Sequence, residues 1–263
     1  MQPDLQVLMV EIRQIAQEEI LPRFARAGFE LKQDGSLLTE ADLATDRRIR
    51  EFLYREWPRI AFLSEEMERK QQERLLRESD SLWCLDPLDG TSNFAAGLPL
   101  FAVSLALFQQ GEVVLALTYD PVRDEMFSAQ KGCGAWLNGK PLRCQGSRFG
   151  LPNAVAIVDF KRLTPRLKCA LMESPPYGSQ RNLGSCVLEW AWMAANRGHL
   201  YLHGGMKLWD LAAGSLILAE AGGHACTLEG EAVFKAAMEP RSVVISPDRG
   251  LFDAWFRYLQ ENR

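Results

Sequence analysis

Two aspartates, a glycine and a threonine stand close together in the segment Asp86-Pro87-Leu88-Asp89-Gly90-Thr91, directly after a short apolar run. Magnesium and calcium prefer carboxylate and carbonyl oxygens, so the two aspartates and the carbonyl of Leu88 could hold a cation. The glycine allows a ligand to approach closely, and the amides of Gly90, Thr91 and Ser92 could hold an anion if a helix begins there. The same residue types also favour a plain tight turn, which leaves both interpretations open at this segment.

Glu65 and Glu66 follow an expected strand, residues 60–63, in the same way that Asp86 follows the apolar strand expected over residues 82–85. We expect the second of these strands to end there because a proline comes next. Chemistry in α/β folds is placed at strand ends, so these carboxylates could meet at one edge of a sheet and supply a further metal ligand. Adjacent glutamates are more often part of a solvated loop, and that alternative stays open.

Asp210 and Asp42 are both expected near the start of a helix. Asp210 opens an apolar helix over residues 210–221, where an aspartate is favoured as a cap. Thr39 is expected to cap the helix that contains Asp42, and their spacing is that of a capping box. A functional role for Asp42 requires that it also points at Thr91 and polarises its hydroxyl. Small residues in the apolar helix would let its backbone pack closely against a neighbour: Ala212, Ala213 and Gly214.

The composition is that of a globular protein long enough to bury a full core. Its 263 residues carry a formal net charge of -4, which argues against nucleic-acid binding as the main activity. Six cysteines are scattered without a Cys-x-x-Cys pair, and the N-terminus lacks the basic region of a secretory signal, so we expect reduced thiols and a cytoplasmic location. The longest apolar run, residues 100–108, is about half of what a helix needs to span a bilayer, so no membrane segment is expected.

Apolar periodicity predicts a sheet-rich first half and a second half in which strands and helices alternate. An amphipathic helix is expected from residue 5 to near Pro22 and a second over residues 42–57, with inward side chains Leu5, Leu8, Ile12 and Ile15 in the first and Leu43, Ile49, Phe52 and Leu53 in the second. The charged run 67–80 is expected to be a solvated helix or a loop. Antiparallel strands are expected over residues 101–108, 112–119, 125–129 and 135–142, the last with an Asn138-Gly139 turn. Further strands are expected over residues 154–159, 200–203 and 243–246, and further helices over residues 164–172, 185–196, 210–221 and after Gly250.

Four sequence blocks carry the candidate chemistry, namely Leu38-Thr39-x-x-Asp42, Ser64-Glu65-Glu66, residues 86–94, and Trp209-Asp210-x-Ala212-Ala213-Gly214 continuing to residue 223. Together they resemble the inositol monophosphatase family, within the lithium-sensitive, magnesium-dependent phosphatase superfamily. Four blocks in the family's order are far more specific than a lone Asp-x-x-Asp-Gly. The resemblance covers nearly the whole chain and implies a layered α-β-α-β-α sandwich of the α+β class, as in fructose-1,6-bisphosphatases. It is expected to divide into an N-terminal α+β subdomain, residues 1–145, and a C-terminal α/β subdomain, residues 146–263.

The resemblance also implies a role for each candidate residue. The ligands of the first magnesium would be Glu65, Asp86 and the carbonyl of Leu88. The ligands of the second would be Asp86, Asp89 and Asp210, and Glu65 would help to hold a third through water. The phosphate would be bound by Gly90, Thr91 and Ser92. Glu66 would be an outer-sphere partner, and Thr91 paired with Asp42 would orient the attacking water.

The implied reaction is the Mg²⁺-dependent hydrolysis of a small polyol or sugar phosphate, such as inositol 1-phosphate, by metal-activated water. The spacing Asp86-x-x-Asp89 is not the Asp-x-Asp expected for an aspartyl-phosphate intermediate, and the sequence has no Cys-x5-Arg loop, so direct hydrolysis is favoured. The resemblance further implies a homodimer, a small phosphorylated metabolite as the binding partner, and inhibition by lithium.

The substrate side departs from the family pattern. Gly184, Ser185 and Cys186 occupy the family's Gly-Ser/Thr-Ala positions, and Asp210 would also face the substrate. We interpret Cys186 as a packing residue because no basic partner is evident. Family members selective for inositol phosphates place an acid seven residues before the last metal aspartate, whereas this sequence has His203 there. A histidine cannot supply a permanent anion, so selectivity for inositol is in doubt.

Several alternatives therefore stay open. A nucleotidase for 3'-phosphoadenosine 5'-phosphate and a fructose-1,6-bisphosphatase would share every metal motif, and a regulatory or binding protein could keep the same fold. His203 could simply end a strand and face solvent. Lys207 could favour a second phosphate on the substrate, although a surface lysine is the favoured interpretation.

Overall fold

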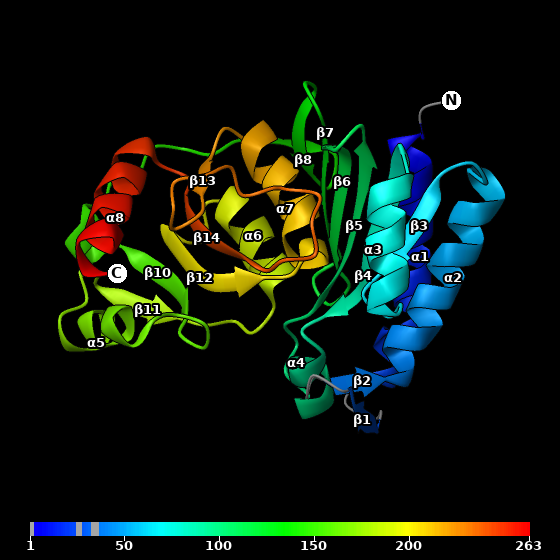
Figure 1. Cartoon of the computed structure of the whole chain (residues 1–263), viewed down its shortest axis with the longest axis horizontal. Coiled ribbons are helices and arrows are strands. Elements are labelled where there is room, and N and C mark those ends of the chain that lie inside the picture. Colours follow the sequence, from blue (N-terminus) through cyan, green and yellow to red (C-terminus); the bar gives the residue numbers. More distant parts are fainter. Residues whose placement is uncertain (1–2, 25–27, 33–36) are drawn as a thin grey trace.

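The computed structural model describes residues 3–24, 28–32 and 37–263. Its elements form five layers in the order α-β-α-β-α, and Figure 1 shows two sheets with helices between them and on both outer faces. This confirms the predicted layered sandwich. The helices that precede or flank the first sheet are α1 (Leu5–Glu19), α2 (Glu40–Glu56) and α3 (Arg69–Glu78). Within the described residues, no helix is both long and apolar enough to cross a bilayer.

The first sheet has seven strands within the described part of the chain, in the spatial order β3 (Ala61–Ser64), β4 (Ser81–Asp89), β5 (Ala102–Gln109), β6 (Glu112–Asp120), β7 (Glu125–Gln130), β8 (Gly134–Leu137) and β9 (Lys140–Leu142). Strands β3 and β4 are parallel, and each later neighbour is antiparallel, as the short connections predict. The predicted Asn138-Gly139 turn joins β8 to β9, with both residues at positive φ. A separate ribbon pairs β1 (Phe29–Leu31) with β2 (Leu37–Thr39).

The second sheet has the order β11 (Ser179–Arg181), β10 (Val155–Asp159), β12 (Leu200–Met206), β14 (Arg241–Ser246) and β13 (His224–Cys226). Strand β10 is parallel to β11 and β12, whereas β14 is antiparallel to both of its neighbours. The helices of this half are α5 (Pro165–Glu173), α6 (Cys186–Ala194), α7 (Leu208–Glu220) and α8 (Arg249–Asn262), and the short helix α4 (Thr91–Ala96) follows β4. Single 3-10 turns are η1 (Leu21–Arg23) and η2 (Leu151–Asn153).

Apolar clusters occupy the interfaces between the layers. Helices α1 and α2 pack on the first sheet through side chains such as Ile12 and Phe52. Helices α6 and α7 fill the space between the two sheets, and α5 and α8 cover the outer face of the second sheet. Helix α7 is apolar on nearly all sides because protein surrounds it. A Cβ atom on Gly214 would lie 2.4 Å from Cβ of Trp190, so this glycine allows α7 to approach α6, as its small residues predict.

The expected end of a strand before Pro87 is wrong, because β4 continues through Pro87 to Asp89. Strand β3 pairs with β4 only as far as Leu85, so one edge of β4 is open at the proline. On the other edge, the pairing with β5 shifts register between Asp86 and Asp89. A proline lacks an N–H and is tolerated at such an irregularity, where no ladder hydrogen bond is required.

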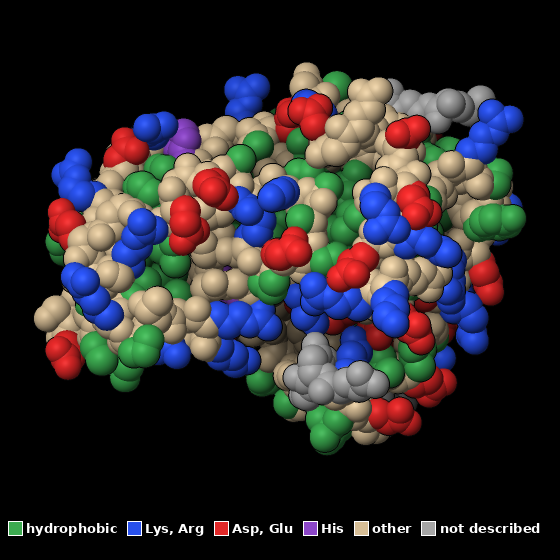
Figure 2. All heavy atoms as spheres, viewed as in Figure 1, with side chains coloured by type: hydrophobic (Ala, Val, Ile, Leu, Met, Phe, Trp, Pro, Cys, Tyr) green, Lys and Arg blue, Asp and Glu red, His purple; other side chains and the backbone are tan. Residues whose placement is uncertain are grey.

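Two helix predictions also need correction. Leu43 is 50% exposed rather than inward, since it lies six positions before the buried Ile49 and therefore on another side of α2. Helix α7 begins at Leu208 rather than at Asp210, which occupies the third helical position. The charged run forms α3, which buries only Gln72, and this agrees with the solvated-helix alternative (Figure 2).

Candidate active site

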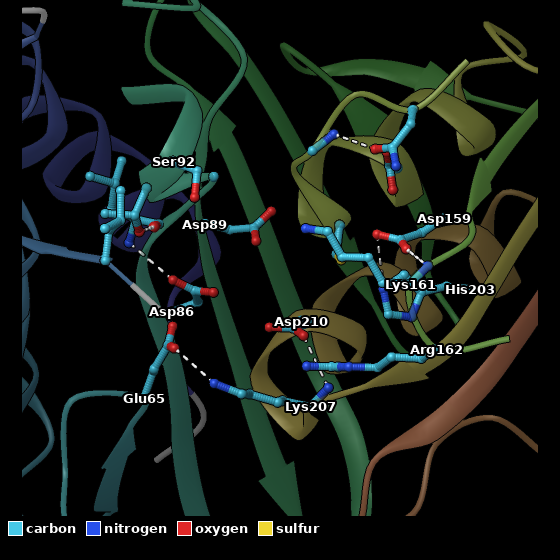
Figure 3. A pocket seen from close by; sticks show the side chains of 18 residues that line it. Glu65, Asp86, Asp89, Ser92, Asp159, Lys161, Arg162, His203, Lys207 and Asp210 are labelled. Carbon is cyan, nitrogen blue, oxygen red and sulfur yellow. Dashed lines mark hydrogen bonds and ion pairs between the residues drawn. The ribbon is translucent and has the colours of Figure 1, made fainter. Parts of the chain in front are cut away.

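Three aspartates from two elements converge at one end of the first sheet. Asp86 and Asp89 lie at the end of β4, and Asp210 lies in the first turn of α7. One carboxylate oxygen of each lies within 4.8 Å of the others, a spacing at which a single cation could contact all three. Figure 3 shows the three side chains around the same pocket.

Asp86 and Asp210 are each held by a nearby backbone amide. The N–H of Leu88 donates to Oδ1 of Asp86 at 3.0 Å, and the N–H of Lys207 donates to Oδ2 of Asp210 at 3.0 Å. Asp210 thus caps α7 from inside its first turn. Among the described residues, the other oxygen of each carboxylate has no protein hydrogen bond and is available to a ligand.

Asp89 is held by the second half of the chain. The hydroxyl of Ser185 donates to its Oδ2 at 2.5 Å, and the N–H of Val187 donates to the same oxygen at 2.8 Å. Ser185 is also the N-cap of α6, so the start of this helix and the carboxylate are fixed together. The sequence predicts Ser185 for the substrate side, but its hydroxyl is directed at Asp89 and the residue does not line the pocket.

Burial disfavours the ionised form of all three aspartates. It raises the pKa of Asp86 and of Asp210 well above the usual range, and neighbouring carboxylates add to this effect. Burial also raises the pKa of Asp89 to about 7, although the hydrogen bond from Ser185 opposes the rise. A bound cation would relieve this repulsion. The oxygen-only donor set fits a hard divalent cation such as Mg²⁺ better than a soft metal.

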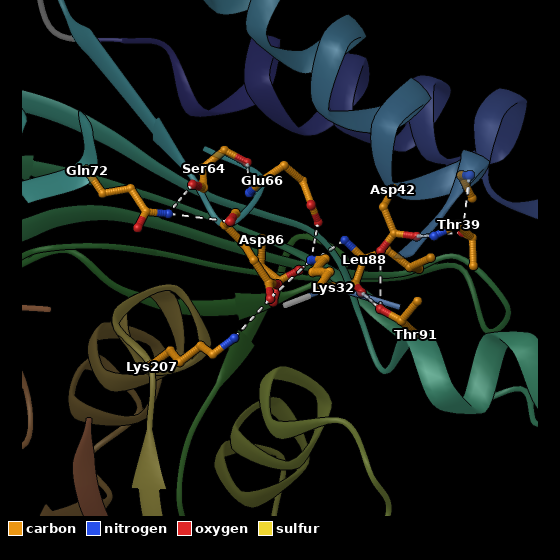
Figure 4. Close-up of polar contacts among 12 residues, drawn as sticks. Lys32, Thr39, Asp42, Ser64, Glu66, Gln72, Asp86, Leu88, Thr91 and Lys207 are labelled. Atoms are coloured by element: carbon orange, nitrogen blue, oxygen red, sulfur yellow. Dashed lines mark hydrogen bonds and ion pairs between the residues drawn. The ribbon is translucent and has the colours of Figure 1, made fainter. Parts of the chain in front are cut away.

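Glu65 lines the same pocket and lies beside two lysines. Its Oε1 is 3.3 Å from Nζ of Lys207 and 3.4 Å from Nζ of Lys32. Glu66 does not line the pocket, and its Oε1 binds Nζ of Lys32 at 2.7 Å (Figure 4). Burial raises the pKa of Glu66 to about 7, although Lys32 opposes the rise. Glu65 therefore faces the carboxylate cluster, while Glu66 anchors Lys32 behind it.

Asp42 contacts Thr91, the interaction on which its expected role depends. Oγ1 of Thr91 lies 3.2 Å from Oδ1 of Asp42 and 3.0 Å from the carbonyl oxygen of Leu88. Oδ2 of Asp42 accepts the N–H of Thr39 at 2.8 Å and its hydroxyl at 2.5 Å, which forms the predicted capping box (Figure 4). Burial raises the pKa of Asp42, although the hydrogen bonds from Thr39 oppose the rise. One carboxylate thus serves both the helix cap and the contact to Thr91.

Gly90 joins β4 to α4 at a φ of +90°, a conformation that favours glycine. A Cβ atom there would lie 2.7 Å from the carbonyl oxygen of Leu100. Helix α4 begins at Thr91, as the anion-binding interpretation of this segment requires. The amides at its start, including that of Ser92, have no partner within the helix.

A cavity of about 240 Å³ lies in front of the aspartates. Most of the predicted site residues line it: Glu65, Asp86, Leu88, Asp89, Gly90, Thr91, Ser92, Gly184, Cys186, His203 and Asp210. Asp42 and Ser185 contact residues that line the cavity but do not line it themselves, and Glu66 does not line it either. The structure adds lining residues that the sequence analysis did not single out: Asp159, Lys161, Arg162, Asn182 and Glu189.

His203 lies in the pocket wall and is 5% exposed, so the interpretation that it faces solvent is wrong. Its Nδ1 accepts the N–H of Gly205 at 3.1 Å, which assigns the ring proton to Nε2, 3.8 Å from the carboxylate of Asp159. Burial lowers the pKa of His203 to about 4, so the ring is neutral near pH 7. Asp159 could have been found from the sequence, because it ends an expected strand just as Glu65 follows one.

Cys186 and Glu189 belong to the first turn of α6. Burial raises the pKa of the Cys186 thiol well above its usual range, in agreement with a packing role. Glu189 accepts the hydroxyl of Tyr201 at 2.8 Å and the N–H of Leu183 at 2.8 Å. Burial raises the pKa of Glu189 to about 7. Glu189 therefore links β12 to the loop that contains Gly184.

The sequence matches the model of the inositol monophosphatase family over residues 2–262. The chain belongs to this family. The resemblance carried by the four sequence blocks is thereby confirmed, and so is the fold class.

Curated relatives carry two different names. A protein of Pasteurella multocida named Nus factor SuhB is 36% identical over 206 residues, which cover 76% of this chain and 75% of the relative. An inositol-1-monophosphatase of Rhizobium meliloti is 36% identical over 210 residues, which again cover 76% of this chain and 75% of the relative. Family membership therefore includes proteins named as enzymes and proteins named as factors.

Solved structures share the whole fold. An IMPase of Thermotoga maritima is 27% identical, with a TM-score of 0.83 over 98% of this chain and 96% of that one. An IMPase/NADP phosphatase complexed with Mg²⁺ and phosphate is 22% identical, with a TM-score of 0.81 over 96% of this chain and 92% of that one. The second likeness shows the fold alone.

Proposed function

We propose that this protein is a magnesium-dependent phosphomonoesterase that acts on a small polyol or sugar phosphate. The observation that carries the proposal is the convergence of Asp86, Asp89 and Asp210 beside the start of α4. Membership of the inositol monophosphatase family supports it, as does the relative named inositol-1-monophosphatase.

The proposed magnesium ligands are Glu65, Asp86, Asp89, Asp210 and the carbonyl of Leu88. Divalent cations bound there would offset the charge of the phosphate and lower the pKa of a coordinated water. Ser185 and Val187 keep one oxygen of Asp89 fixed, which leaves the other for the cation.

Asp42 and Thr91 would orient the attacking water. Because the carbonyl of Leu88 is assigned to a cation, we assign the hydroxyl proton of Thr91 to Asp42. The oxygen of Thr91 can then accept a hydrogen bond from water. The amides at the start of α4, those of Gly90, Thr91 and Ser92, would donate to the phosphate. No side chain has to act as a covalent nucleophile.

The test is phosphate release from inositol 1-phosphate with Mg²⁺ and with a chelator. We expect activity only with Mg²⁺, and Asp89→Asn should lower kcat/KM by about 100-fold, the usual upper range when a metal site is disturbed. Asp253→Asn is the matched control, since Asp253 is an exposed residue of α8 whose carboxylate pairs with Arg249. Full activity of Asp89→Asn in a folded protein would show that the metal assignment is wrong.

A regulatory role is the second candidate, because a relative that is 36% identical is named Nus factor SuhB. All of the proposed metal ligands are present, so we place regulation beside catalysis rather than instead of it. A stoichiometric partner in a pull-down, together with no phosphate release from any small phosphate ester, would reverse this order.

The homodimer and inhibition by lithium remain predictions from the family, and the cytoplasmic location remains a prediction from the cysteine pattern and the N-terminal residues. Lithium is tested in the same assay, at concentrations that inhibit other members of the superfamily. An unchanged rate would count against a labile second cation site.

A further inference from the structure

The wall of the pocket that faces the aspartates is formed by the loop after β10. This loop brings Asp159, Lys161 and Arg162 to the cavity, beside His203 of β12 (Figure 3). Asp159 is already engaged, because it accepts the N–H of Lys161 at 2.6 Å and faces Nε2 of His203 at 3.8 Å. The wall therefore carries two cationic side chains and one carboxylate that is partly satisfied.

Two glycines in β12 bring this loop close to the strand. A Cβ atom on Gly204 would lie 2.3 Å from the backbone oxygen of Arg162, a contact that a side chain cannot make. A Cβ atom on Gly205 would lie 3.3 Å from Cδ of Arg162, and the guanidinium donates to the carbonyl of Gly205. The pairing of β12 with β14 also shifts register in this stretch. The local backbone thus places Arg162 across β12 and into the pocket.

The other charged groups nearby have partners on the metal side. Lys207 lies 3.3 Å from Glu65 and over the ring of Trp209. His203 is neutral near pH 7, because burial lowers its pKa to about 4. By contrast, no carboxylate oxygen of residues 3–24, 28–32 or 37–263 lies within 4.0 Å of a side-chain nitrogen of Lys161 or Arg162.

We propose that the substrate carries a second phosphate, which Lys161 and Arg162 bind at the wall opposite the aspartates. This inference rests on the proposed phosphatase function, because the first phosphate is the one that is released. A neutral polyol would offer these two cations only hydroxyls, whereas a phosphate accepts several charge-assisted hydrogen bonds from a guanidinium and an ammonium.

The experiment compares pairs of substrates that differ only in the second phosphate. Suitable pairs are inositol 1,4-bisphosphate with inositol 1-phosphate, fructose 1,6-bisphosphate with fructose 1-phosphate, and adenosine 3',5'-bisphosphate with adenosine 3'-monophosphate. We expect kcat/KM to favour the bisphosphate in at least one pair by about tenfold or more, the size of one charge-assisted contact. The preference should fall as salt is added, because screening weakens the contact.

Substitutions at Lys161 and Arg162 test whether these residues cause the bisphosphate preference. In Lys161→Gln and Arg162→Gln the bisphosphate preference should fall several-fold, and in the double variant it should approach one. Arg162→Lys should retain part of it, since it keeps the charge. Arg166→Gln is the control, because Arg166 lies on α5, contacts the carbonyl of Glu261 and does not line the pocket.

Three results would overturn the inference. Hydrolysis of monophosphates with no bisphosphate preference in any pair, or with a preference that survives in the double variant, would overturn it and leave the proposed function intact. If no compound is hydrolysed with Mg²⁺, the proposed function fails, and titration calorimetry of the two esters of each pair, in the presence of a chelator, still decides whether the second-phosphate site exists. The inference is supported if a bisphosphate binds more tightly than its monophosphate and this difference is lost in the double variant. Equal binding of the two esters overturns the inference.

Discussion

Thr91 has one hydroxyl proton and two acceptors within reach, Asp42 at 3.2 Å and the carbonyl of Leu88 at 3.0 Å. Only one of them can receive the proton at a time. A cation on the carbonyl of Leu88 would leave Asp42 as the acceptor, and the threonine oxygen would then be oriented to accept from water. The buried carboxylate of Asp42 is fixed by both polar groups of Thr39, so it has little freedom to leave Thr91.

We expect Thr91→Val to lower kcat on inositol 1-phosphate by about 100-fold or more, the usual contribution of a positioned proton-transfer group. Thr91→Ser keeps the hydroxyl and should retain most of the activity. Asp42→Asn should lower kcat by a similar factor. The double variant of Thr91→Val and Asp42→Asn should lower kcat little more than either single change, because the effects of residues that act as one unit are not additive. These rates are measured with saturating Mg²⁺, with circular dichroism to confirm folding. Equal activity of Thr91→Val and Thr91→Ser would exclude the hydroxyl from the reaction.

The sequence predicted the aspartates of the site, but it did not predict the residues of the opposite pocket wall. Asp86, Leu88, Asp89, Gly90 and Thr91 are adjacent in the chain, so their clustering requires only one strand and one turn. The residues of the opposite wall, Lys161 and Arg162, are exposed loop residues with no local pattern. Their placement depends on how closely the loop approaches two glycines of another strand, and that contact arises only when the sheet is assembled.

At the scale of elements, the contact between α6 and α7 links both sheets to the site. The start of α6 fixes Asp89 through Ser185, and the start of α7 carries Asp210. The two helices meet where Gly214 of α7 faces Trp190 of α6. A change in their separation would therefore move two carboxylates relative to each other.

Gly214→Ala should lower the free energy of unfolding by about 1–3 kcal/mol, the usual cost of overpacking a core. The added Cβ would lie 2.4 Å from Cβ and Cγ of Trp190, and these atoms near the backbone cannot move aside easily. Urea denaturation measures the change. Gly28→Ala is the control, since a Cβ atom there meets no atom of the described residues within 4 Å. A variant at position 214 as stable as wild type would show that the two helices can separate freely.

The elements that could be predicted are those with long apolar patterns. Helix α1 and strands β5 to β7 follow the periodicity, whereas the mixed charges of the α3 segment predicted only that it is solvated, as a helix or as a loop. The course of β4 through Pro87 could not be predicted, because it depends on where the neighbouring β3 ends. The three-residue strands β1, β2, β11 and β13 are too short to show a period, and they exist only because a partner strand lies beside them.

At the scale of the whole molecule, the pocket lies between the two halves of the chain. The first sheet ends at Leu142 and the second begins at Val155, on either side of the predicted boundary between residues 145 and 146. Helices α6 and α7 nevertheless pack on the first sheet, and one apolar cluster draws residues from both halves. The proposed subdomains 1–145 and 146–263 therefore share a core, and we regard them as parts of one folding unit.

Buried acids make the stability of the metal-free protein depend on pH. Burial raises the pKa of Asp89 and of Glu189 to about 7, and it raises those of Asp86 and Asp210 well above the usual range of an aspartate. An acid with a raised pKa binds more protons in the folded state than in the unfolded state, so its contribution is complete below about pH 4 and is lost as pH rises through the folded pKa. We expect the free energy of unfolding in a chelator to fall between about pH 4 and pH 7, because the acids lose their protons in the folded state across this range. Backbone hydrogen bonds lower the pKa of Asp248, so its titration changes the free energy of unfolding only below about pH 4.

Mg²⁺ should reverse the fall, because it binds the ionised carboxylates of the folded state. At neutral pH and a concentration 100 times its dissociation constant, it would add about 2.7 kcal/mol to the free energy of unfolding. At pH 4 protons compete for the same carboxylates, so the gain should be small. Urea denaturation at a series of pH values, with Mg²⁺ and with a chelator, measures both effects. Asp89→Asn should reduce the gain at neutral pH, whereas the control Asp253→Asn should leave it unchanged. A stability that rises from pH 4 to pH 7 without metal would contradict the raised pKa values, and a neutral-pH stability insensitive to Mg²⁺ would contradict the cation site itself.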